Sequence, residues 1–455
     1  MNETRELADF ASTLTLGEIP ERTRAHAKLL ILDQLGCQIG SARLPWSQQV
    51  YQTITELGSS GRSVVMAMGD QVRADDAAFI NSTFGAANEI DDAHTGVRTH
   101  AGAVVVPAAF AVAQAQGTTA GADLLLATIV GYEVMLRVAW AAFPTLMAKQ
   151  HSAVTVGSFG AGAATAAIFG LDGPGMLNTL AIAGSHSSGL MEYTESGGSV
   201  KRIHTAIGSS SGVRSGYLAR SGLTGPLAAL EGRRGFLEAF ADRGNTGRLT
   251  KDLGRTFLID GVGPKSYFAE YRIHAPLQAL EILTREHGLG LADIESMRVG
   301  VTSVTMEAVG TIIEPADTLG AQFSMRFALA LAAKYGPAAL RDVTDDLLAD
   351  PEVAALAAKV EMYIDPGLEP RKWETFGGVL SITTTDGRTC TLAQAEPLGS
   401  PRNPMSERQL REKFRMLAEP ELGSARCGAI IDAVARLEEA DLRSDLLPHV
   451  VGHQR

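Results

Sequence analysis

The sequence predicts a mainly α protein in which an all-helical domain carries an inserted α+β domain. Before residue 265 the chain is built of apolar stretches with helical spacing, many of them rich in Ala and Gly. Between 265 and 396 β-branched residues alternate with polar ones, and after 396 the helical pattern returns. A chain of 455 residues is also too long for one simple core. We therefore predict a helical domain from residues 1–264 and 397–455, and an α+β domain from residues 265–396.

The helices of the first part follow from its apolar periodicity. The stretch "IPERTRAHAKLLILDQLGCQIGSARL" has Pro20 near its start and an apolar face that includes Ala27 and Leu30. "SVVMAMG" predicts a short strand, and "RADDAAFINSTFGAANEI" predicts a helix that runs into a charged cluster. Interior helices are predicted where the sequence is hydrophobic nearly all round: "AGAVVVPAAFAVAQAQG", "GADLLLATIVGYEVMLRVAWAAF" and "SFGAGAATAAIFGLD".

The α+β part is predicted from three strand-like stretches. "SMRVGVTSV" and the two halves of "GGVLSITTTDGRTCTLAQA" have β-branched alternation, and Asp386-Gly387 is a hairpin turn signal. The acidic stretch "DVTDDLLADPEVAALAAKV" between them predicts helices. The final stretch, from "NPMSERQLREKF" onward, is helical again.

The charge and the cysteines of the chain indicate which partners and which cellular compartment to expect. The net charge is −11 and the pI is near 5.5, without a basic run, which argues against a nucleic-acid partner. Cys37, Cys390 and Cys427 are scattered without a CxxC pair, which is typical of a reduced, cytoplasmic protein. No signal peptide is predicted, and the stretch around Pro107 is too short to span a bilayer. We expect a cytoplasmic chain that binds no membrane.

The most unusual segment is "NEIDDAHTGVRTHAG", residues 88–102. It concentrates six ionisable groups in an apolar region: Glu89, Asp91, Asp92, His94, Arg98 and His100. If the preceding helix ends near Ile90, each carboxylate lies at its negative end, at a cost of about 0.3–1 kcal/mol. Three interpretations stay open on the residues alone, namely an exposed acidic loop, a metal site, and a catalytic pocket with perturbed pKa values.

Three distant segments favour the catalytic pocket. His151 precedes a glycine-rich helix start, where backbone N–H groups favour an anion. "GGSVKRIHTAIGSSSG" brings three basic side chains, and "KSYFAEYRIHAPLQAL" lies at the border of the α+β part, where clefts tend to form. Each segment alone also fits a structural histidine or a solvated surface. Their candidate residues are Lys201, Arg202, His204, Lys265, Tyr267, Arg272 and His274.

The stretch "GAANEIDDAHTGVRTHAGAVVVPAAFAVAQ" resembles the acidic and histidine motifs of the MmgE/PrpD family. The resemblance continues through "KRIHTAIGSSSGVRSGYLARSGLTGPLAALEGRRGFLEAF" and "KSYFAEYRIHAPLQAL" to "GSPRNPMSERQLREKFRMLA", so it covers essentially the whole chain. The family includes 2-methylcitrate dehydratase, cis-aconitate decarboxylase and iminodisuccinate epimerase. The resemblance implies an all-helical domain, an α+β lid domain, a homodimer, and an active site between the domains without metal or organic cofactor.

The resemblance also assigns the pocket positions. It implies that Glu89, Asp91 and Asp92 match the family's acidic motif, and that His100 and His151 match its two pocket histidines. It further implies pocket roles for the basic and aromatic positions Lys201, His204, Lys265, Tyr267 and His274. The chain departs from the family pattern at Glu89, Ala93, Ala101, Gly102 and Arg272. These departures put the family's usual tricarboxylate substrates in doubt.

The family reactions share a proton transfer at a carbon next to a carboxylate. That step needs acid–base groups of suitable pKa and cations that stabilise the developing charge. We expect a small anionic carboxylate substrate, with dehydration of the 2-methylcitrate type as the main expectation. Decarboxylation of the cis-aconitate type and epimerisation of an iminodisuccinate-like compound are the alternatives. A helical scaffold without activity and a metal-dependent hydratase are the rival classes.

Roles follow from this chemistry. The predicted catalytic residues are His100, His151, Lys201, His274 and Asp91. The predicted substrate-binding residues are Glu89, Asp92, His94, Arg98, His204, Lys265, Tyr267 and Arg272. No metal ligand and no cofactor site is predicted.

Overall fold

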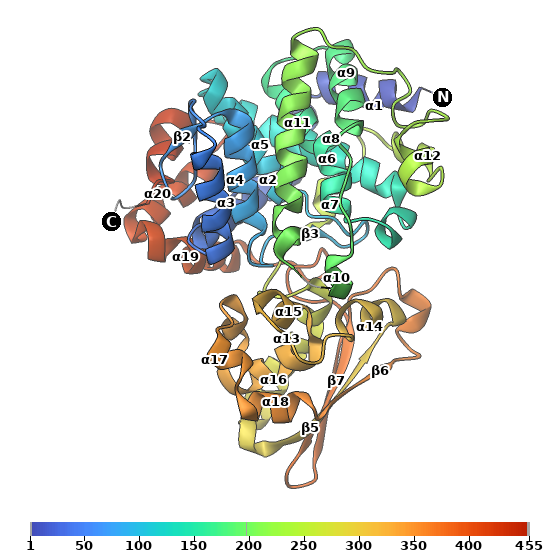
Figure 1. The fold of residues 1–455 in the computed structure, drawn as a ribbon, viewed down its shortest axis with the longest axis vertical. Coiled ribbons are helices and arrows are strands. Elements are labelled where there is room, and N and C mark those ends of the chain that lie inside the picture. Colours follow the sequence, from blue (N-terminus) through green and yellow to red (C-terminus); the bar gives the residue numbers. More distant parts are fainter. Residues whose placement is uncertain (1, 197, 453–455) are drawn as a thin grey trace. The chain divides into compact units, whose positions relative to one another are not determined.

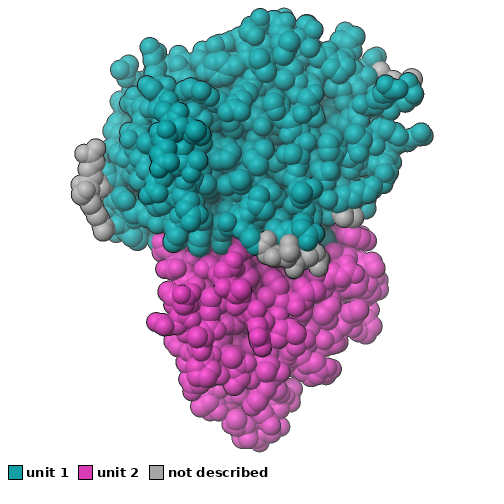
Figure 2. All heavy atoms as spheres, viewed as in Figure 1, with its two compact units in different colours: residues 1–87, 91–262, 406–455 teal, residues 88–90, 263–405 magenta. Residues whose placement is uncertain are grey.

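The computed structural model describes residues 2–196 and 198–452, which form two compact units (Figures 1 and 2). Unit 1 contains residues 1–87, 91–262 and 406–455, and unit 2 contains residues 88–90 and 263–405. The chain therefore passes between the units four times. Two of these passages flank the three residues 88–90. A mainly α fold with an α+β part is confirmed.

Unit 1 is made of helices from both ends of the chain. Its helices are α1 (Glu3–Thr13), α2 (Glu21–Ser41), α3 (Pro45–Glu56), α4 (Ala74–Ala86), α5 (Gly102–Gln116), α6 (Gly121–Ala142), α7 (Ser152–Thr155), α8 (Gly157–Ile168), α9 (Gly173–Gly184), α10 (Tyr193–Ser196), α11 (His204–Arg220), α12 (Phe236–Ala241), α19 (Glu407–Leu422) and α20 (Ser424–Ala435). Short strands β1 (Ser63–Val64), β2 (Gln71–Val72) and β3 (Asp92–His94) lie between them. The final stretch thus returns to the helical unit, as α19 packs on α2.

Unit 2 combines a four-stranded sheet with helices. Its strands are β5 (Ile294–Val301), β6 (Val360–Ile364), β7 (Gly378–Thr384) and β8 (Thr389–Gln394), in the order β6-β5-β7-β8. β5 and β6 are parallel and the other pairs are antiparallel. The helices are α13 (His274–His287), α14 (Ser303–Val309), α15 (Thr318–Phe323), α16 (Met325–Tyr335), α17 (Asp345–Leu348) and α18 (Pro351–Ala357), and β4 (Val262–Pro264) lies at the start of the unit.

The predicted hairpin is confirmed, with Gly387 at φ +86° in the turn between β7 and β8. The parallel strand β6 was not predicted, because its five residues follow the acidic helices without a turn signal. The prediction that this helix runs to Ile90 is wrong, since α4 ends at Ala86.

Small residues set how closely the interior helices of unit 1 approach. α8 packs on both α6 and α11, as Figure 1 shows for α8 and α11. At the crossing with α11, a Cβ on Gly212 would lie 2.5 Å from both the Ala161 Cβ and the Gly162 backbone nitrogen. At the crossing with α6, a Cβ on Gly160 would lie 2.6 Å from the Met135 Cβ. These interior helices of unit 1 therefore pack closely, and α7 and α11 also lie in contact with each other.

Helix α6 is long and apolar enough, by length and composition alone, to cross a membrane. However, 89% of its apolar window is buried inside the protein, as expected of a core helix. Pro107, around which the apolar stretch is too short to span a bilayer, lies in a different helix, α5.

We predict that Gly212→Ala destabilises the protein by about 2 kcal/mol, because the added methyl meets backbone that cannot move freely. This exceeds the gain of roughly 0.5–1 kcal/mol that Gly→Ala brings to an open helix position. Urea unfolding measures the difference. Gly17→Ala is the control, since nothing lies within 4 Å of its Cβ position. Equal stabilities of the two variants would contradict the packing argument.

Candidate active site

The acidic segment after α4 is buried rather than exposed. Glu89, Asp91 and Asp92 are only 2%, 3% and 1% exposed, so the interpretation of this segment as an exposed acidic loop is wrong. The chain leaves the helix at Ala86, and Glu89 adopts a left-handed backbone with φ +52°. The carboxylates therefore do not lie on the last turn of the helix, and the helix dipole does not act on them as the sequence had suggested.

His100 is held by Asp91. The His100 Nδ1 lies 3.0 Å from the Asp91 Oδ2 and 2.9 Å from the backbone oxygen of Asp92. Both neighbours are acceptors, so Nδ1 carries the proton and donates it. This fixes the tautomer, with the proton on Nδ1 and the lone pair on Nε2. The His100 side chain is 20% exposed, whereas that of Asp91 is 4% exposed, so the imidazole is the accessible member of the pair.

Asp92 is held by a different set of groups. Its Oδ2 accepts a hydrogen bond of 2.6 Å from the Tyr132 hydroxyl, and its Oδ1 accepts one of 2.9 Å from the Gly102 N–H. A side chain at Gly102 could not fit, because its Cβ would lie 2.6 Å from the Asp92 Oδ2 and 2.6 Å from the Tyr132 hydroxyl oxygen. Burial raises the pKa of Asp92 to about 7, with the Asp91 charge adding to the rise and the Tyr132 hydrogen bond opposing it.

A second pair of histidines lies next to His100. The Nδ1 atoms of His151 and His204 are 3.0 Å apart, so one ring donates to the other. The ring centroids of His100 and His151 are 6.4 Å apart, and Tyr193 lies edge-on to His151 at 5.8 Å and to His204 at 5.6 Å. Burial, and then the Lys201 charge, lower the pKa of His204 to about 4, so this imidazole is neutral at neutral pH.

The position of these histidines follows from local backbone structure. His151 precedes α7, and the Ser152 hydroxyl donates a 2.8 Å hydrogen bond to the backbone oxygen of Arg98, which joins α7 to the acidic segment. His204 begins α11, directly after a 3-10 turn, Ser199–Ile203, that carries Lys201. The next residue, Arg202, stacks over the Trp46 ring at 3.8 Å and donates to the backbone oxygen of Ala87.

His94 stabilises a turn through hydrogen bonds with the backbone. Its Nδ1 accepts hydrogen bonds from the backbone N–H groups of Gly96 and Val97, at 3.1 and 3.2 Å, and closes the turn that precedes His100. Burial lowers the pKa of His94 to about 4. Arg98 lies in the same turn with φ +53° and is 9% exposed. The structure thus gives both predicted substrate-binding residues a place in a tight turn.

Within unit 2, Glu89 pairs with Lys265. The Lys265 Nζ lies 3.1 Å from the Glu89 Oε2, and their side chains are 1% and 3% exposed. The neighbouring Asn88 is also fixed in this unit, since its amide donates to the backbone oxygen of Arg341 and accepts from Gln322, each at 2.9 Å. Glu89, the first acidic residue of the segment, therefore forms its ion pair with a lysine of unit 2.

His274 and its neighbours form a compact aromatic group in the same unit. The His274 ring is fully buried, with Nε2 3.1 Å from the Ala269 backbone oxygen and Nδ1 3.4 Å from the Ser266 hydroxyl oxygen. It stacks on Tyr271 at 5.0 Å and meets Tyr267 edge-on at 5.3 Å. The remaining predicted residues also pair internally, Tyr267 with Glu281 and Arg272 with Glu270.

Apart from His94 and Arg98 in the turn, the predicted residues fall into two groups, one in each unit. The histidine cluster of unit 1 comprises Asp91, Asp92, His100, His151, His204 and, through its charge, Lys201. The unit 2 group comprises Glu89, Lys265, Tyr267, Arg272 and His274. Sequence reasoning missed Tyr132 and Tyr193 in the first group. A buried tyrosine in an otherwise aliphatic helix was the available signal for Tyr132.

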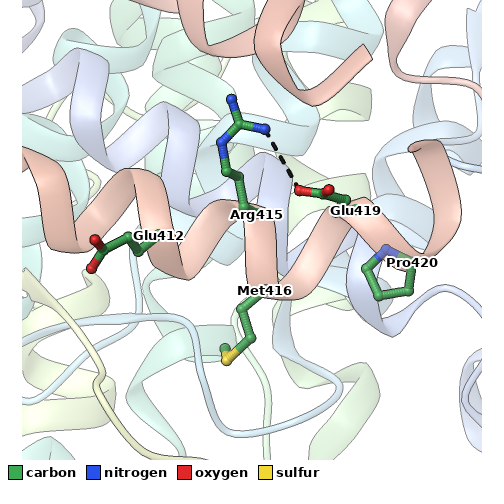
Figure 3. A pocket seen from close by; sticks show the side chains of 5 residues that line it. All are labelled: Glu412, Arg415, Met416, Glu419 and Pro420. Atoms are coloured by element: carbon green, nitrogen blue, oxygen red, sulfur yellow. Dashed lines mark ion pairs between the residues drawn. The ribbon is translucent and has the colours of Figure 1, made fainter. Parts of the chain in front are cut away.

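Among the described residues, no group of three or more His, Cys, Asp or Glu is arranged to hold a metal ion. A shallow depression at the surface of unit 1 is lined by α19 alone, through Glu412, Arg415, Met416, Glu419 and Pro420 (Figure 3). None of these belongs to the histidine cluster.

The chain matches a family model along most of its length. The MmgE/PrpD N-terminal domain matches residues 5–248, and the MmgE/PrpD C-terminal domain matches residues 267–439. The chain belongs to the MmgE/PrpD family.

Proteins named as cis-aconitate decarboxylases are similar to nearly the whole chain. The chain is 30% identical to the cis-aconitate decarboxylase of Aspergillus terreus, over 98% of this chain and 94% of that one. It is 27% identical to a cis-aconitate decarboxylase-like protein of Aspergillus oryzae, over 99% and 98% of the two chains, and 26% identical to the human cis-aconitate decarboxylase, over 96% and 92%. These relatives support an enzyme of the lyase class. They favour the decarboxylase alternative over the dehydratase that was the main expectation.

Asp92→Asn should reduce the pH dependence of stability. The native pKa of Asp92 is raised, so the folded protein holds this proton when the unfolded chain has lost it. Stability therefore falls as the pH rises from about 4 to about 7, by on the order of 3 kcal/mol. The variant loses that part of the fall, as urea unfolding at pH 4.5 and 8 measures. The exposed Asp342→Asn is the control, and an unchanged fall in Asp92→Asn contradicts the assignment.

Proposed function

We propose that this protein is a carboxy-lyase that removes carbon dioxide from an unsaturated tricarboxylate of the cis-aconitate type, without a metal or organic cofactor. The observation that carries the proposal is the similarity to cis-aconitate decarboxylases over nearly the whole of both chains. The histidine cluster supports it, because it offers His100 with its ring orientation fixed by Asp91, next to a pair of hydrogen-bonded imidazoles, His151 and His204.

The proposed reaction is a decarboxylation coupled to a shift of the double bond. In such a substrate one carboxylate sits on a methylene carbon next to the alkene. The bond to that carboxylate breaks, and its electron pair forms a new double bond with the central carbon. The former alkene electrons move to the outer carbon, which bears another carboxylate, and this carbon takes one proton. The products are carbon dioxide and an unsaturated dicarboxylate.

His100 is the proposed proton donor to that carbon. Asp91 accepts a hydrogen bond from Nδ1 and holds the ring in place, and the protonated imidazole delivers its Nε2 proton to the carbon. After transfer, Nε2 is reprotonated from solvent, which the partial exposure of the ring permits. Asp92 is a positioning residue in this scheme, because its backbone oxygen accepts from the same Nδ1.

The other cluster members are proposed to hold the anionic substrate. Negative charge develops next to a carboxylate in this reaction, so a fixed cation lowers the barrier. Lys201 is the proposed cation, since its charge contributes to the lowered pKa of His204 in the cluster. His204 stays neutral and orients His151 through their shared hydrogen bond, and His151 is proposed to bind a substrate carboxylate.

The unit 2 residues are proposed to support their own unit rather than to transfer protons. Both ring nitrogens of His274 already face partners there. A homodimer and a cytoplasmic location, which the sequence predicts, remain proposals here.

His100→Gln should lower kcat by about 10²- to 10⁴-fold, the usual contribution of a general acid. The variant should keep the wild-type circular dichroism spectrum, because the histidine lies at the accessible edge of the cluster. Turnover of cis-aconitate is the measurement. The matched control is the exposed His287→Gln on α13, which should retain full activity. A His100→Gln enzyme as active as that control excludes His100 as the acid.

We expect the purified protein to release one carbon dioxide per cis-aconitate consumed. In deuterated water the product should carry one deuterium on the carbon next to a carboxylate, which NMR detects, and a chelator should leave the rate unchanged. The same assay with 2-methylcitrate tests dehydration, through loss of water. With iminodisuccinate it tests epimerisation, through deuterium exchange without loss of a group. Activity on either of these and none on cis-aconitate overturns the proposal.

A further inference from the structure

Three aromatic rings form a compact group within the histidine cluster. The ring centroids of His151 and His204 are 5.0 Å apart, and their planes are tilted by 39°. Tyr193 meets both imidazoles edge-on, with centroid distances of 5.8 Å and 5.6 Å and interplanar angles of 84° and 75°. Edge-to-face aromatic contacts have energies comparable to that of a hydrogen bond, so they resist rotation of the rings that make them.

The segment that carries Tyr193 is fastened to the backbone around His151. The Thr155 hydroxyl donates a 2.7 Å hydrogen bond to the backbone oxygen of Ser188. The His151 N–H donates to the backbone oxygen of Gly189 at 3.3 Å, and Tyr193 follows four residues later. Tyr193 is therefore placed from the same backbone that carries one of the two histidines.

Tyr193 turns inward from a segment at the surface of unit 1. Leu190 is 75% exposed, whereas Tyr193 is 9% exposed. Among the described residues, the large hydrophobic cluster of unit 1 does not include Tyr193. Its ring packs on the two imidazoles instead, so removing the ring should affect the histidines more than the core.

The hydrogen bond between the two imidazoles depends on the orientation of both rings. The Nδ1 atoms of His151 and His204 are 3.0 Å apart, and each lies off the Cβ–Cγ axis about which its ring rotates. The torsion about this bond is intrinsically broad for histidine, so other contacts must hold the rings. One Nδ1 carries the shared proton and the other is unprotonated, so the contact also fixes both tautomers. A neutral His151 can donate from Nε2 to a substrate carboxylate only when His204 supplies the shared proton.

We propose that Tyr193 is a positioning residue of this pair, and that its ring holds His151 and His204 in the orientation in which they share one Nδ1 proton. The ring performs this role because it contacts both imidazoles, whereas the hydroxyl lies 3.6 Å from the Met191 sulfur of its own segment. The inference rests on the proposed function for its consequence in turnover, which is a His151 that is oriented to bind the substrate. Tyr193 acts through the histidines and not on the substrate.

Loss of the ring should loosen the histidine pair, whereas loss of the hydroxyl alone should not. The full-length protein is labelled with ¹⁵N in its histidine rings, and NMR detects the scalar coupling that passes between the two Nδ1 atoms through their hydrogen bond. His151→Gln and His204→Gln assign the signals by their disappearance. The coupling should be present in the wild type and in Tyr193→Phe. In Tyr193→Leu it should fall about twofold or more, because the rings then also adopt orientations without the hydrogen bond.

Tyr217→Leu is the matched control. Tyr217 also meets an aromatic ring edge-on, that of Phe169 at 4.9 Å and 84°, and it lies on α11, the helix that His204 begins. Its contacts do not include the histidine pair. The variant should therefore keep the coupling at its wild-type strength, whatever its loss of stability in urea.

Turnover provides the second measurement. With cis-aconitate as substrate, Tyr193→Leu should raise KM about 10-fold with a smaller change in kcat, since it weakens a hydrogen bond to a charged group. Tyr193→Phe should restore the wild-type KM.

A coupling reduced in Tyr193→Leu and kept in Tyr193→Phe and Tyr217→Leu supports the proposal. A coupling that persists in Tyr193→Leu, one lost in either of the other two variants, or none in the wild type overturns it. If Tyr193→Leu does not fold, Tyr193→Met takes its place, because it also removes the ring and fills more of its space. The coupling needs no substrate, so a protein with the expected couplings and no turnover of cis-aconitate contradicts the proposed decarboxylation alone.

Discussion

The burial of three carboxylates within four residues is the constraint on which the site depends. A buried carboxylate is costly unless it is paired or hydrogen-bonded, and each of these three has its own compensation. Glu89 has Lys265, Asp91 has His100, and Asp92 has a tyrosine hydroxyl and a backbone N–H. Three different partners mean three different protonation behaviours. The same segment can therefore contain a structural ion pair, an acid–base pair and a carboxyl that titrates near neutrality.

Much of this arrangement could be predicted from the sequence. Apolar periodicity located the interior helices, and the Asp386-Gly387 signal located the hairpin of unit 2. The concentration of ionisable groups between Glu89 and His100 marked the site, since so many charges in an apolar region require compensation. The family resemblance then joined it to His151 and His204, which local patterns alone leave as ordinary structural histidines.

Other features depend on contacts that no local pattern encodes. The sequence predicted a helix to Ile90, whereas Glu89 has a left-handed backbone and pairs with Lys265, 176 residues away. β6 was missed because it owes its existence to pairing with β5 rather than to its own composition. The Tyr132 partner of Asp92 likewise comes from α6, and only the packing of helices brings the two groups together. The sequence therefore located the buried charged segment, but it did not identify the partners of its carboxylates.

The absence of a side chain at Gly102 ties the size of one backbone position to the protonation of a carboxyl. A single extra carbon here would lie 2.6 Å from both the Asp92 Oδ2 and the Tyr132 hydroxyl oxygen. A larger residue must therefore separate these two groups. Their hydrogen bond is the largest contribution that lowers the pKa of Asp92, so its loss shifts this carboxyl further toward its neutral form.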